Sequence, residues 1–116
     1  MSTTESILSH HLEMFGEQDI EGIMEDFADD AVLITQTETF RGHEEIRGLF
    51  EDLFPEFADP ATTFSLDNQE VEGDYAYIVW HAETPDTEYE FATDTFVVRN
   101  GEIVAQILAA QTTTKN

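Results

Sequence analysis

Asp94 lies in the middle of an apolar, β-branched run, EFATDTFVVRNGEIVAQI, at residues 90–107. The run is typical of two strands joined by a tight turn at Asn100-Gly101. A carboxylate in a half-buried strand costs free energy unless it is neutralised, hydrogen-bonded or used. Burial raises the pKa of a carboxyl group, so Asp94 in its neutral form would donate a hydrogen bond at neutral pH. The pattern indicates an acid placed for acid–base chemistry, or a partly solvated carboxylate bonded to the backbone or a hydroxyl without a catalytic role.

Two histidines, His11 and His81, are candidates to work with this acid. A carboxylate partner orients an imidazole ring and moves its pKa within the physiological range, so a His–Asp pair is a reasonable acid–base unit. Each histidine alone is equally typical of a core or rim position. The same residue types also hold metal ions, but no HxH or HxxxH spacing exists, and His10 and His11 point to different faces of a helix. We therefore predict no metal site and no cofactor.

The helices and strands that must position these residues follow from the spacing of apolar residues, which changes near residue 61. Before it, helical spacing occurs in three stretches, at 7–15, 20–27 and 46–54, and Pro55 is expected to end the third helix. A strand at 31–37 and a short return strand, ETFRG, lie between the second and third helices. After residue 61, alternation with a period of two predicts four long antiparallel strands. This order predicts an α+β fold with helices packed on one face of a curved sheet.

The charge of the chain excludes several kinds of partner. Its 116 residues include 26 acidic and 4 basic side chains and no cysteine, with a net charge of −22. Such a chain repels nucleic acid phosphates and anionic membranes, so neither is an expected partner. No apolar run approaches the roughly 18 residues of a spanning helix, and the N-terminus has no secretory signal pattern. We expect one cytoplasmic domain over residues 1–116.

The acid-rich, lysine-poor composition is typical of a protein from the cytoplasm of a salt-loving organism. Repulsion among like charges destabilises a compact state, and molar salt removes most of that cost by screening. A generically acidic bacterial protein is the alternative interpretation. The dependence of stability on KCl separates the two.

Four segments occur in an order and spacing that resemble the nuclear transport factor 2-like superfamily, especially its SnoaL-like and ketosteroid-isomerase-like branches. They are DIEGIMEDFADDAVL (19–33), FRGHEEIRGLF (40–50), VEGDYAYIVWHAE (71–83) and DTFVVRNGEIVAQ (94–106), and the resemblance covers nearly the whole chain. It implies a cone-shaped half-barrel, in which a curved, mostly antiparallel sheet wraps around three helices of the N-terminal half. It also implies a deep apolar pocket for a small apolar molecule, acidic groups inside the cone, and a homodimer formed through the outer sheet face.

Strand alternation and the family's pattern divide the side chains between the inside and the outside of this cone. The apolar side chains expected on the outer face form a row that is larger than a monomer usually exposes. This row favours the homodimer, although a tail or helix could cover it instead. The expected outward row is Ile78, Trp80, Val97 and Ile107. The expected ligand contacts inside, beside Asp94, His11 and His81, are Phe15, Thr35, Tyr77, Val79, Phe96, Gln106, Leu108 and Ala110.

The resemblance also shows which catalytic residues of ketosteroid-isomerase-like enzymes this sequence lacks. Asp94 matches the acid of ketosteroid-isomerase-like enzymes that stays protonated and donates a hydrogen bond to the substrate oxyanion. Their general base falls at Thr35, whose hydroxyl has no accessible pKa, and their oxyanion-hole tyrosine falls at His11. The usual steroid isomerase mechanism is therefore not expected.

Three interpretations of the function stay open at this point, because the superfold hosts many unrelated functions. The first is an acid–base isomerase, cyclase or hydratase for an apolar, oxygen-bearing ligand, with Asp94 donating and His11 or His81 moving the proton. The second is a non-catalytic binder in which Asp94 and Tyr77 orient the ligand. The third is an assembly domain whose cone is filled by side chains.

Overall fold

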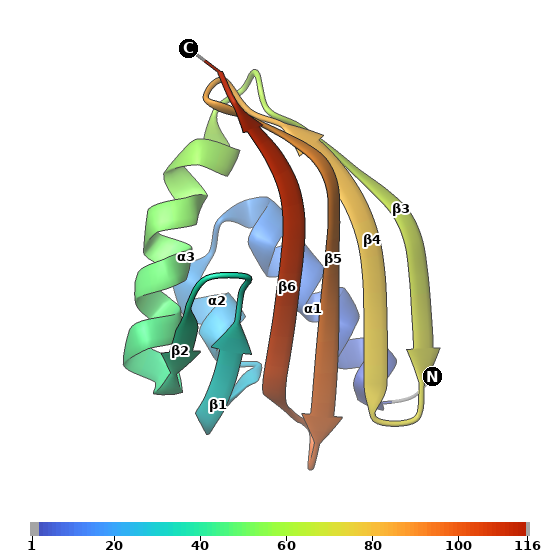
Figure 1. Ribbon diagram of the computed structural model, residues 1–116. Coiled ribbons are helices and arrows are strands. Elements are labelled where there is room, and N and C mark those ends of the chain that lie inside the picture. Colours follow the sequence, from blue (N-terminus) through green and yellow to red (C-terminus); the bar gives the residue numbers. More distant parts are fainter. Residues whose placement is uncertain (1–2, 116) are drawn as a thin grey trace.

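The computed structural model describes residues 3–115 and shows an α+β protein in which helices cover the concave face of a curved sheet (Figure 1). The helices lie in the N-terminal half, where the helical spacing of apolar residues predicts them. None of the helices in this part of the chain is long and apolar enough to cross a membrane. They are α1 (Thr3–Glu17), α2 (Ile20–Met24) and α3 (Gly42–Ala58).

Six strands form one unclosed sheet in the order β2-β1-β6-β5-β4-β3. The β1–β6 pairing is parallel and the other pairings are antiparallel. The predicted cone, with a curved and mostly antiparallel sheet around helices of the N-terminal half, is confirmed. The strands are β1 (Phe27–Ile34), β2 (Thr39–Arg41), β3 (Thr63–Glu72), β4 (Tyr75–Glu83), β5 (Thr87–Arg99) and β6 (Glu102–Thr114).

The long β5–β6 hairpin turns at Asn100 and Gly101, as the sequence predicts. Both residues have positive φ, 54° and 77°, which is the backbone of a two-residue turn whose twist matches that of the strands. The register pairs Phe96 with Gln106, and paired residues of antiparallel strands share a face. Alternation places Asp94 on that same face. A register shift between Val97 and Val98 moves the pairing by one residue from the register of the turn, and this shift brings Gln106 to the face of Asp94.

β4 faces the opposite way from the prediction. Its register places Ile78 opposite Asp94 and Trp80 opposite Ala92, so both large apolar side chains lie inside the cone. The buried set of β4 is wholly apolar, whereas the exposed set includes His81 and Glu83, so alternation favours the observed orientation. A one-residue shift exchanges the two faces. The inward orientation predicted for Tyr77, Val79 and His81, and the outward one predicted for Ile78 and Trp80, are wrong.

α3 continues past Pro55 to Ala58, whereas the sequence predicts its end at the proline. A proline has no N–H and removes one helical hydrogen bond. The aromatic ring of Phe57, beyond the proline, lies against Phe15 and Tyr89, with centroids 5.1 and 5.4 Å apart. Because these tertiary contacts fix the last turn of α3, the helix extends over the mouth of the cone.

The core lies between the helices and the concave face of the sheet. Fully buried apolar side chains come from α1, α2, α3 and the four strands β1, β4, β5 and β6, so helices and sheet share one cluster. Among the acidic side chains of the described residues, only Asp26 and Asp94 are buried. The largest apolar side chains with almost no exposed area are Leu8, Ile23, Phe27, Leu33, Ile46, Phe96 and Ile103.

A histidine–aspartate contact outside the core ties α1 to the segment before β1. His10 Nδ1 lies 2.7 Å from Asp26 Oδ2, and the Asp26 carbonyl accepts a hydrogen bond from the Ile103 N–H. The hydrogen bond to Asp26 raises the pKa of His10, against a smaller lowering by burial. Burial raises the pKa of Asp26, against the opposing effect of His10.

We expect the contribution of His10 to the free energy of unfolding to fall as the pH rises from about 6 to 8. His11 acts in the opposite direction over the same range, because burial lowers its folded pKa to about 3, so a matched variant is needed to isolate His10. His10 has a raised pKa in the folded state, so its stabilisation is complete below the unfolded pKa and is lost as the pH rises through the folded value. Asp26 acts in the same direction, because a carboxyl with a raised folded pKa destabilises the fold once it ionises. Urea unfolding at several pH values measures the slope.

The matched variant for this prediction is His10→Gln. It removes the titrating ring and keeps a polar side chain at a half-exposed position, while the acid-rich surface that also titrates is unchanged. Between pH 6 and 8 the free energy of unfolding should fall less with pH, or rise more, in the variant than in the wild type. Equal slopes in the two proteins would mean that the His10–Asp26 contact contributes nothing to the pH dependence.

Candidate functional site

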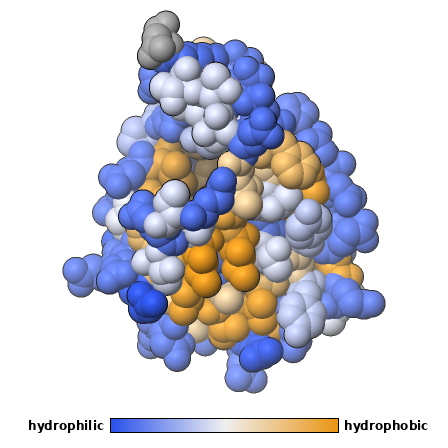
Figure 2. All heavy atoms as spheres, viewed as in Figure 1, coloured by the Kyte–Doolittle hydropathy of each residue, from blue (hydrophilic) through white to orange (hydrophobic). Residues whose placement is uncertain are grey.

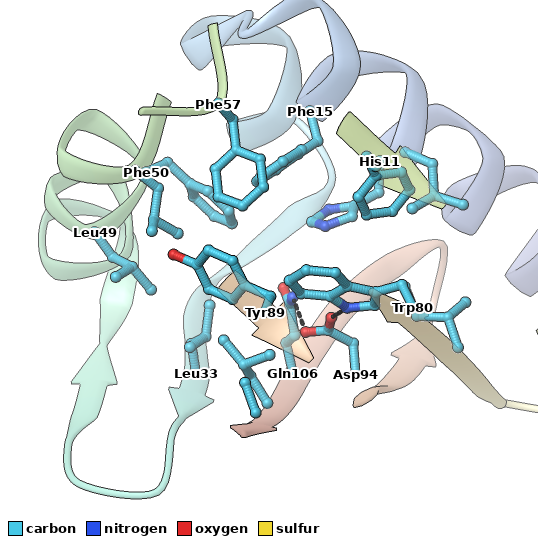
Figure 3. Close-up of a pocket in the computed structure, with 16 residues that line it drawn as sticks. His11, Phe15, Leu33, Leu49, Phe50, Phe57, Trp80, Tyr89, Asp94 and Gln106 are labelled. Atoms are coloured by element: carbon cyan, nitrogen blue, oxygen red, sulfur yellow. Dashed lines mark hydrogen bonds between the residues drawn. The ribbon is translucent and has the colours of Figure 1, made fainter. Parts of the chain in front are cut away.

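A cavity of about 80 Å³ lies inside the cone, between the aromatic side chains of α1 and α3 and the concave face of the sheet (Figure 3). Its walls are almost entirely apolar, with three polar side chains, Asp94, Gln106 and His11, among them. Lysine and arginine are absent from the lining. The other lining residues are Leu12, Phe15, Leu33, Leu49, Phe50, Leu53, Phe57, Phe64, Ile78, Trp80, Tyr89, Leu108 and Ala110.

Asp94 is held by two donors, one on each carboxyl oxygen. The Trp80 indole N–H donates to Oδ2 at 2.8 Å, and the Gln106 amide donates to Oδ1 at 2.9 Å. Burial raises the pKa of Asp94, and the hydrogen bonds from Gln106 and Trp80 oppose part of that rise. Desolvation disfavours the charged form while donors favour it, so the two effects compete at this side chain. The result is an oriented carboxyl group that keeps its proton to a higher pH than an exposed aspartate does.

His11 forms part of the opposite wall, on α1 above the sheet (Figure 3). Its ring lies edge-on to Phe96, Phe27 and Phe50, with centroids 4.9, 5.9 and 6.0 Å away. Burial and the neighbouring His10 lower the pKa of His11 to about 3. The ring is therefore neutral at physiological pH. Its Nδ1 is buried and has no hydrogen-bond partner within the described residues.

Gln106 leaves a second polar atom without a partner. Its amide nitrogen is used by Asp94, while its Oε1 is buried and accepts no hydrogen bond from residues 3–115. Unpartnered buried polar atoms are rare in folded proteins, because each loses its hydrogen bonds to water. Both side chains with an unpartnered atom, His11 and Gln106, line the same cavity.

An aromatic cluster of Phe57, Phe64, Trp80 and Tyr89 forms the side of the cavity near the end of α3. Trp80 contacts the other three rings at centroid distances of 5.4 to 6.4 Å. The Tyr89 hydroxyl donates to Glu56 Oε1 at 3.3 Å. Burial and the nearby Glu56 charge raise the pKa of Tyr89 to about 12, so this hydroxyl stays protonated and serves to fix the rim.

The structure places some of the predicted site residues together and separates others. Four predicted ligand contacts, Phe15, Gln106, Leu108 and Ala110, lie in the cavity lining. Phe96 is buried beside it against His11. Whether these side chains bind a ligand stays a prediction.

Four other predicted site residues lie outside the cavity. Thr35 follows the end of β1, where its hydroxyl accepts backbone N–H groups of the β1–β2 turn. His81 is exposed on the outer face and lies 2.8 Å from Asp67 Oδ2, so it is separated from Asp94 by the sheet. Tyr77 and Val79 share that outer face, because β4 is shifted by one residue from the predicted orientation. Neither histidine forms a hydrogen bond to Asp94 within the described part of the chain.

Trp80 is the site residue that sequence reasoning missed. Its indole N–H is a donor that needs a partner when the ring is buried, and Asp94 is the buried acceptor one strand away. That complementarity was a usable signal for the orientation of β4. No group of three or more histidine, aspartate or glutamate side chains among residues 3–115 is arranged to hold a metal ion.

The fold and the cavity together define a class of protein: a small α+β cone with an aromatic pocket and one buried carboxyl group. The chain belongs to the SnoaL-like domain family, whose model matches residues 8–106. The resemblance found in the sequence is thereby confirmed. No curated protein matches the sequence.

Solved structures share the fold over nearly the whole chain. A provisionally assigned ketosteroid isomerase from Kribbella flavida has a TM-score of 0.81 at 10% identity, over 98% of this chain and 82% of that chain. A provisionally assigned polyketide cyclase from Sinorhizobium meliloti has a TM-score of 0.73 at 16% identity, over 93% and 99%. An isomerase of the SnoaL-like family from Agrobacterium tumefaciens, also provisionally assigned, has a TM-score of 0.72 at 17% identity, over 96% and 99%. Sequence identities this low show a common fold only, so the activity has to be inferred from the residues of the site.

Proposed function

We propose that this protein is a cofactor-independent acid–base enzyme that isomerises, cyclises, hydrates or dehydrates a small apolar molecule carrying an oxygen function. The observation that carries the proposal is Asp94, a buried carboxyl group with a raised pKa in the wall of an apolar cavity. Asp94 gives a proton to, or takes one from, the ligand. Trp80 and Gln106 hold the carboxyl in one orientation, which is what proton transfer requires.

The proposal gives His11 a different role from the proton shuttle considered from sequence. A pKa of about 3 means that His11 takes up almost no proton near neutral pH. The neutral ring donates or accepts a hydrogen bond at Nδ1 and so positions the ligand opposite Asp94. His81 has no part in the proposal, because it lies on the outer face.

A second candidate, a non-catalytic binder using the same cavity, is favoured by one observation. Both carboxyl oxygens of Asp94 already accept hydrogen bonds, and no base in residues 3–115 is hydrogen-bonded to it. A carboxylate that only orients a bound ligand needs no base beside it. The unfilled cavity argues against the third interpretation, an assembly domain whose cone is packed solid.

Exchange of carbon-bound protons in D₂O tests the enzyme proposal. The probes are cyclopentanone, cyclohexanone and their 2-hydroxy derivatives, followed by NMR at neutral pD with wild-type protein in molar KCl. We expect the protein to accelerate exchange next to the carbonyl, and Asp94→Asn to reduce that acceleration about 10²–10⁴-fold. Asp67→Asn is the matched control, because it makes the same chemical change at an exposed site on β3.

The outcomes separate the candidates. Exchange that is equally fast in wild type and Asp94→Asn contradicts catalysis by Asp94. Binding of the probes without any exchange supports the binder. Absence of both binding and exchange contradicts the proposed pocket function.

The outer sheet face is proposed to pair with a second copy of this chain. The central outward positions on β6, β5 and β4 carry no acidic residue, and the acidic residues of these strands, Glu83, Glu88, Glu90 and Glu102, lie toward the strand ends, Asp94 inside the cone excepted. Figure 2 shows the resulting apolar area at the centre of this face. Charge is depleted at the centre of protein interfaces, and two copies meet here without opposing carboxylates. Exposed apolar side chains in the area include Ile34, Tyr75, Tyr77, Phe91 and Ile107.

Ile107→Asp is expected to convert the dimer to a monomer. The side chain is 44% exposed at the centre of the face, opposite Ile34 and Thr95, so both copies would bring a charge to the interface. Sedimentation equilibrium in molar KCl measures the mass over a range of concentrations. Leu66→Asp is the control, because Leu66 is exposed to a similar degree but pairs with Trp80 on the concave side. A monomeric wild type contradicts the proposed dimer.

A further inference from the structure

The identity of the ligand's polar group follows from the two unpartnered atoms of the cavity. Gln106 Oε1 is an amide oxygen and can only accept. The amide cannot turn round while Asp94 is ionised, because Oε1 would then face a carboxylate oxygen in place of the N–H that now donates at 2.9 Å. While Asp94 is ionised, Gln106 therefore offers an acceptor to a molecule in the cavity.

His11 Nδ1 adds a second requirement from the opposite wall. A neutral imidazole nitrogen either carries a proton and donates or lacks it and accepts. A hydroxyl group both donates and accepts, so it can bond to Gln106 Oε1 and complement either tautomer of His11. A carbonyl oxygen cannot donate and leaves Gln106 Oε1 unpaired.

The charge around the cavity excludes an anion. The lining has no lysine or arginine. The basic side chains lie elsewhere: Arg47 pairs with Glu21, Lys115 pairs with Glu83, and Arg41 and Arg99 are exposed at strand ends. A carboxylate or phosphate on the ligand would lose its hydration without gaining a counter-charge, in a chain that already carries −22.

The size of the cavity limits the ligand further. Its volume is about 80 Å³, whereas pockets for drug-sized ligands range over roughly 300–1,000 Å³. Aromatic and aliphatic side chains form nearly all of its surface. The cavity suits a single small ring, and a steroid-sized molecule does not fit without movement of the walls.

We infer that the ligand of this cavity is a small, uncharged, single-ring alcohol, whose hydroxyl donates a hydrogen bond to Gln106 Oε1 and meets His11 Nδ1. The inference rests on the proposed small-molecule pocket and names the class of molecule that the pocket takes. It assigns Gln106 as the residue that selects for a hydroxyl. The reaction at Asp94 then acts on a hydroxylated substrate or product.

Three probes of equal ring size test the inference: cyclohexanol, cyclohexanone and cyclohexanecarboxylate. Ligand-observed NMR at neutral pH in molar KCl gives their dissociation constants with the wild-type protein. We expect cyclohexanol to bind at least about tenfold more tightly than cyclohexanone, because the ketone leaves a buried acceptor unpaired. We expect no measurable binding of the carboxylate.

Gln106→Met tests whether the preference for the alcohol over the ketone depends on Gln106 Oε1. Methionine has a similar length and no strong acceptor, so the preference for the alcohol over the ketone should disappear. The comparison of the three probes on wild-type protein stands by itself if this variant does not fold.

Ketone binding equal to or tighter than alcohol binding would overturn the inference and leave the pocket function standing. Carboxylate binding comparable with alcohol binding would do the same. A preference for the alcohol that survives in Gln106→Met would overturn the role of Gln106. If none of the three probes binds, the proposed pocket function itself fails together with the inference.

Discussion

Trp80→Ala is expected to lower the free energy of unfolding by about 3–5 kcal/mol, the usual cost of removing a large buried aromatic side chain. Trp80 is 8% exposed and contacts three other aromatic rings of the cavity wall. Its removal also leaves one oxygen of buried Asp94 without its donor. Urea unfolding followed by circular dichroism measures the change.

Tyr77→Ala provides the comparison for this prediction. Tyr77 is 38% exposed on the outer face of the same strand, so its replacement should cost less than about 1 kcal/mol. The two variants, Trp80→Ala and Tyr77→Ala, are best compared in an Ile107→Asp background, which removes any contribution of dimer formation to the measured stability. A larger loss for Tyr77→Ala than for Trp80→Ala would mean that β4 faces the other way and that the described cavity wall is wrong.

Trp80→Phe separates the hydrogen bond from the packing of the ring. Phenylalanine keeps most of the aromatic contacts and removes the N–H that donates to Asp94 Oδ2. Because this donor favours the charged carboxylate, its loss should raise the pKa of Asp94 further. Carbon-detected NMR of the Asp94 carboxyl group, titrated in both proteins, measures the difference. An unchanged pKa would show that the indole contributes nothing to the protonation of Asp94.

Salt is expected to stabilise this protein more than any single favourable substitution. All acidic side chains of the described residues except Asp26 and Asp94 are at least partly exposed, and the net charge is −22. The Debye length falls from about 30 Å at 0.01 M to about 3 Å at 1 M salt. We expect the melting temperature to rise by about 10–20 °C between these limits, which corresponds to several kcal/mol for a domain of this size.

The control for the salt effect is a neutral osmolyte. KCl and sucrose both strengthen apolar burial by exclusion from the surface, whereas only KCl screens charge. The rise should therefore be much larger in KCl than in sucrose of equal osmolality, and most of it should occur below about 0.5 M. A melting temperature that does not change with KCl would contradict the interpretation as a protein adapted to high salt.

The unpartnered atoms of His11 and Gln106 are informative because the rest of the core is well satisfied. Buried polar groups without partners cost stability, and folded proteins retain them mainly at sites with a use for them. Here the side chains that carry both atoms line the same cavity as Asp94. A hydroxylated ligand would remove the cost of both atoms and place its oxygen beside Asp94.

The inward positions of Asp94 on β5 and Gln106 on β6 were predicted correctly, whereas the orientation of β4 was predicted wrongly. The Asn100-Gly101 turn is a local signal, but a register shift between Val97 and Val98 lies between it and Gln106, so the turn alone does not place Gln106 on the face of Asp94. In β4 one alternating set is wholly apolar, and the other ends in His81 and Glu83, so alternation within the strand favours the orientation that the structure shows. The apolar set is Ala76, Ile78, Trp80 and Ala82. The prediction followed the family's pattern instead, and pairing with β5 shows that it was wrong.

The amino-acid sequence by itself determined the order of helices and strands and the hairpin at Asn100-Gly101, because these depend on local period and turn chemistry, whereas the resemblance to a known family supplied the cone and the inward position of Asp94. The tertiary structure alone decided what Asp94 contacts. Trp80 and Gln106 reach its two oxygens through strand register, and His11 reaches the same cavity from α1 through helix packing. Such contacts join residues far apart in the chain, and no local pattern encodes them.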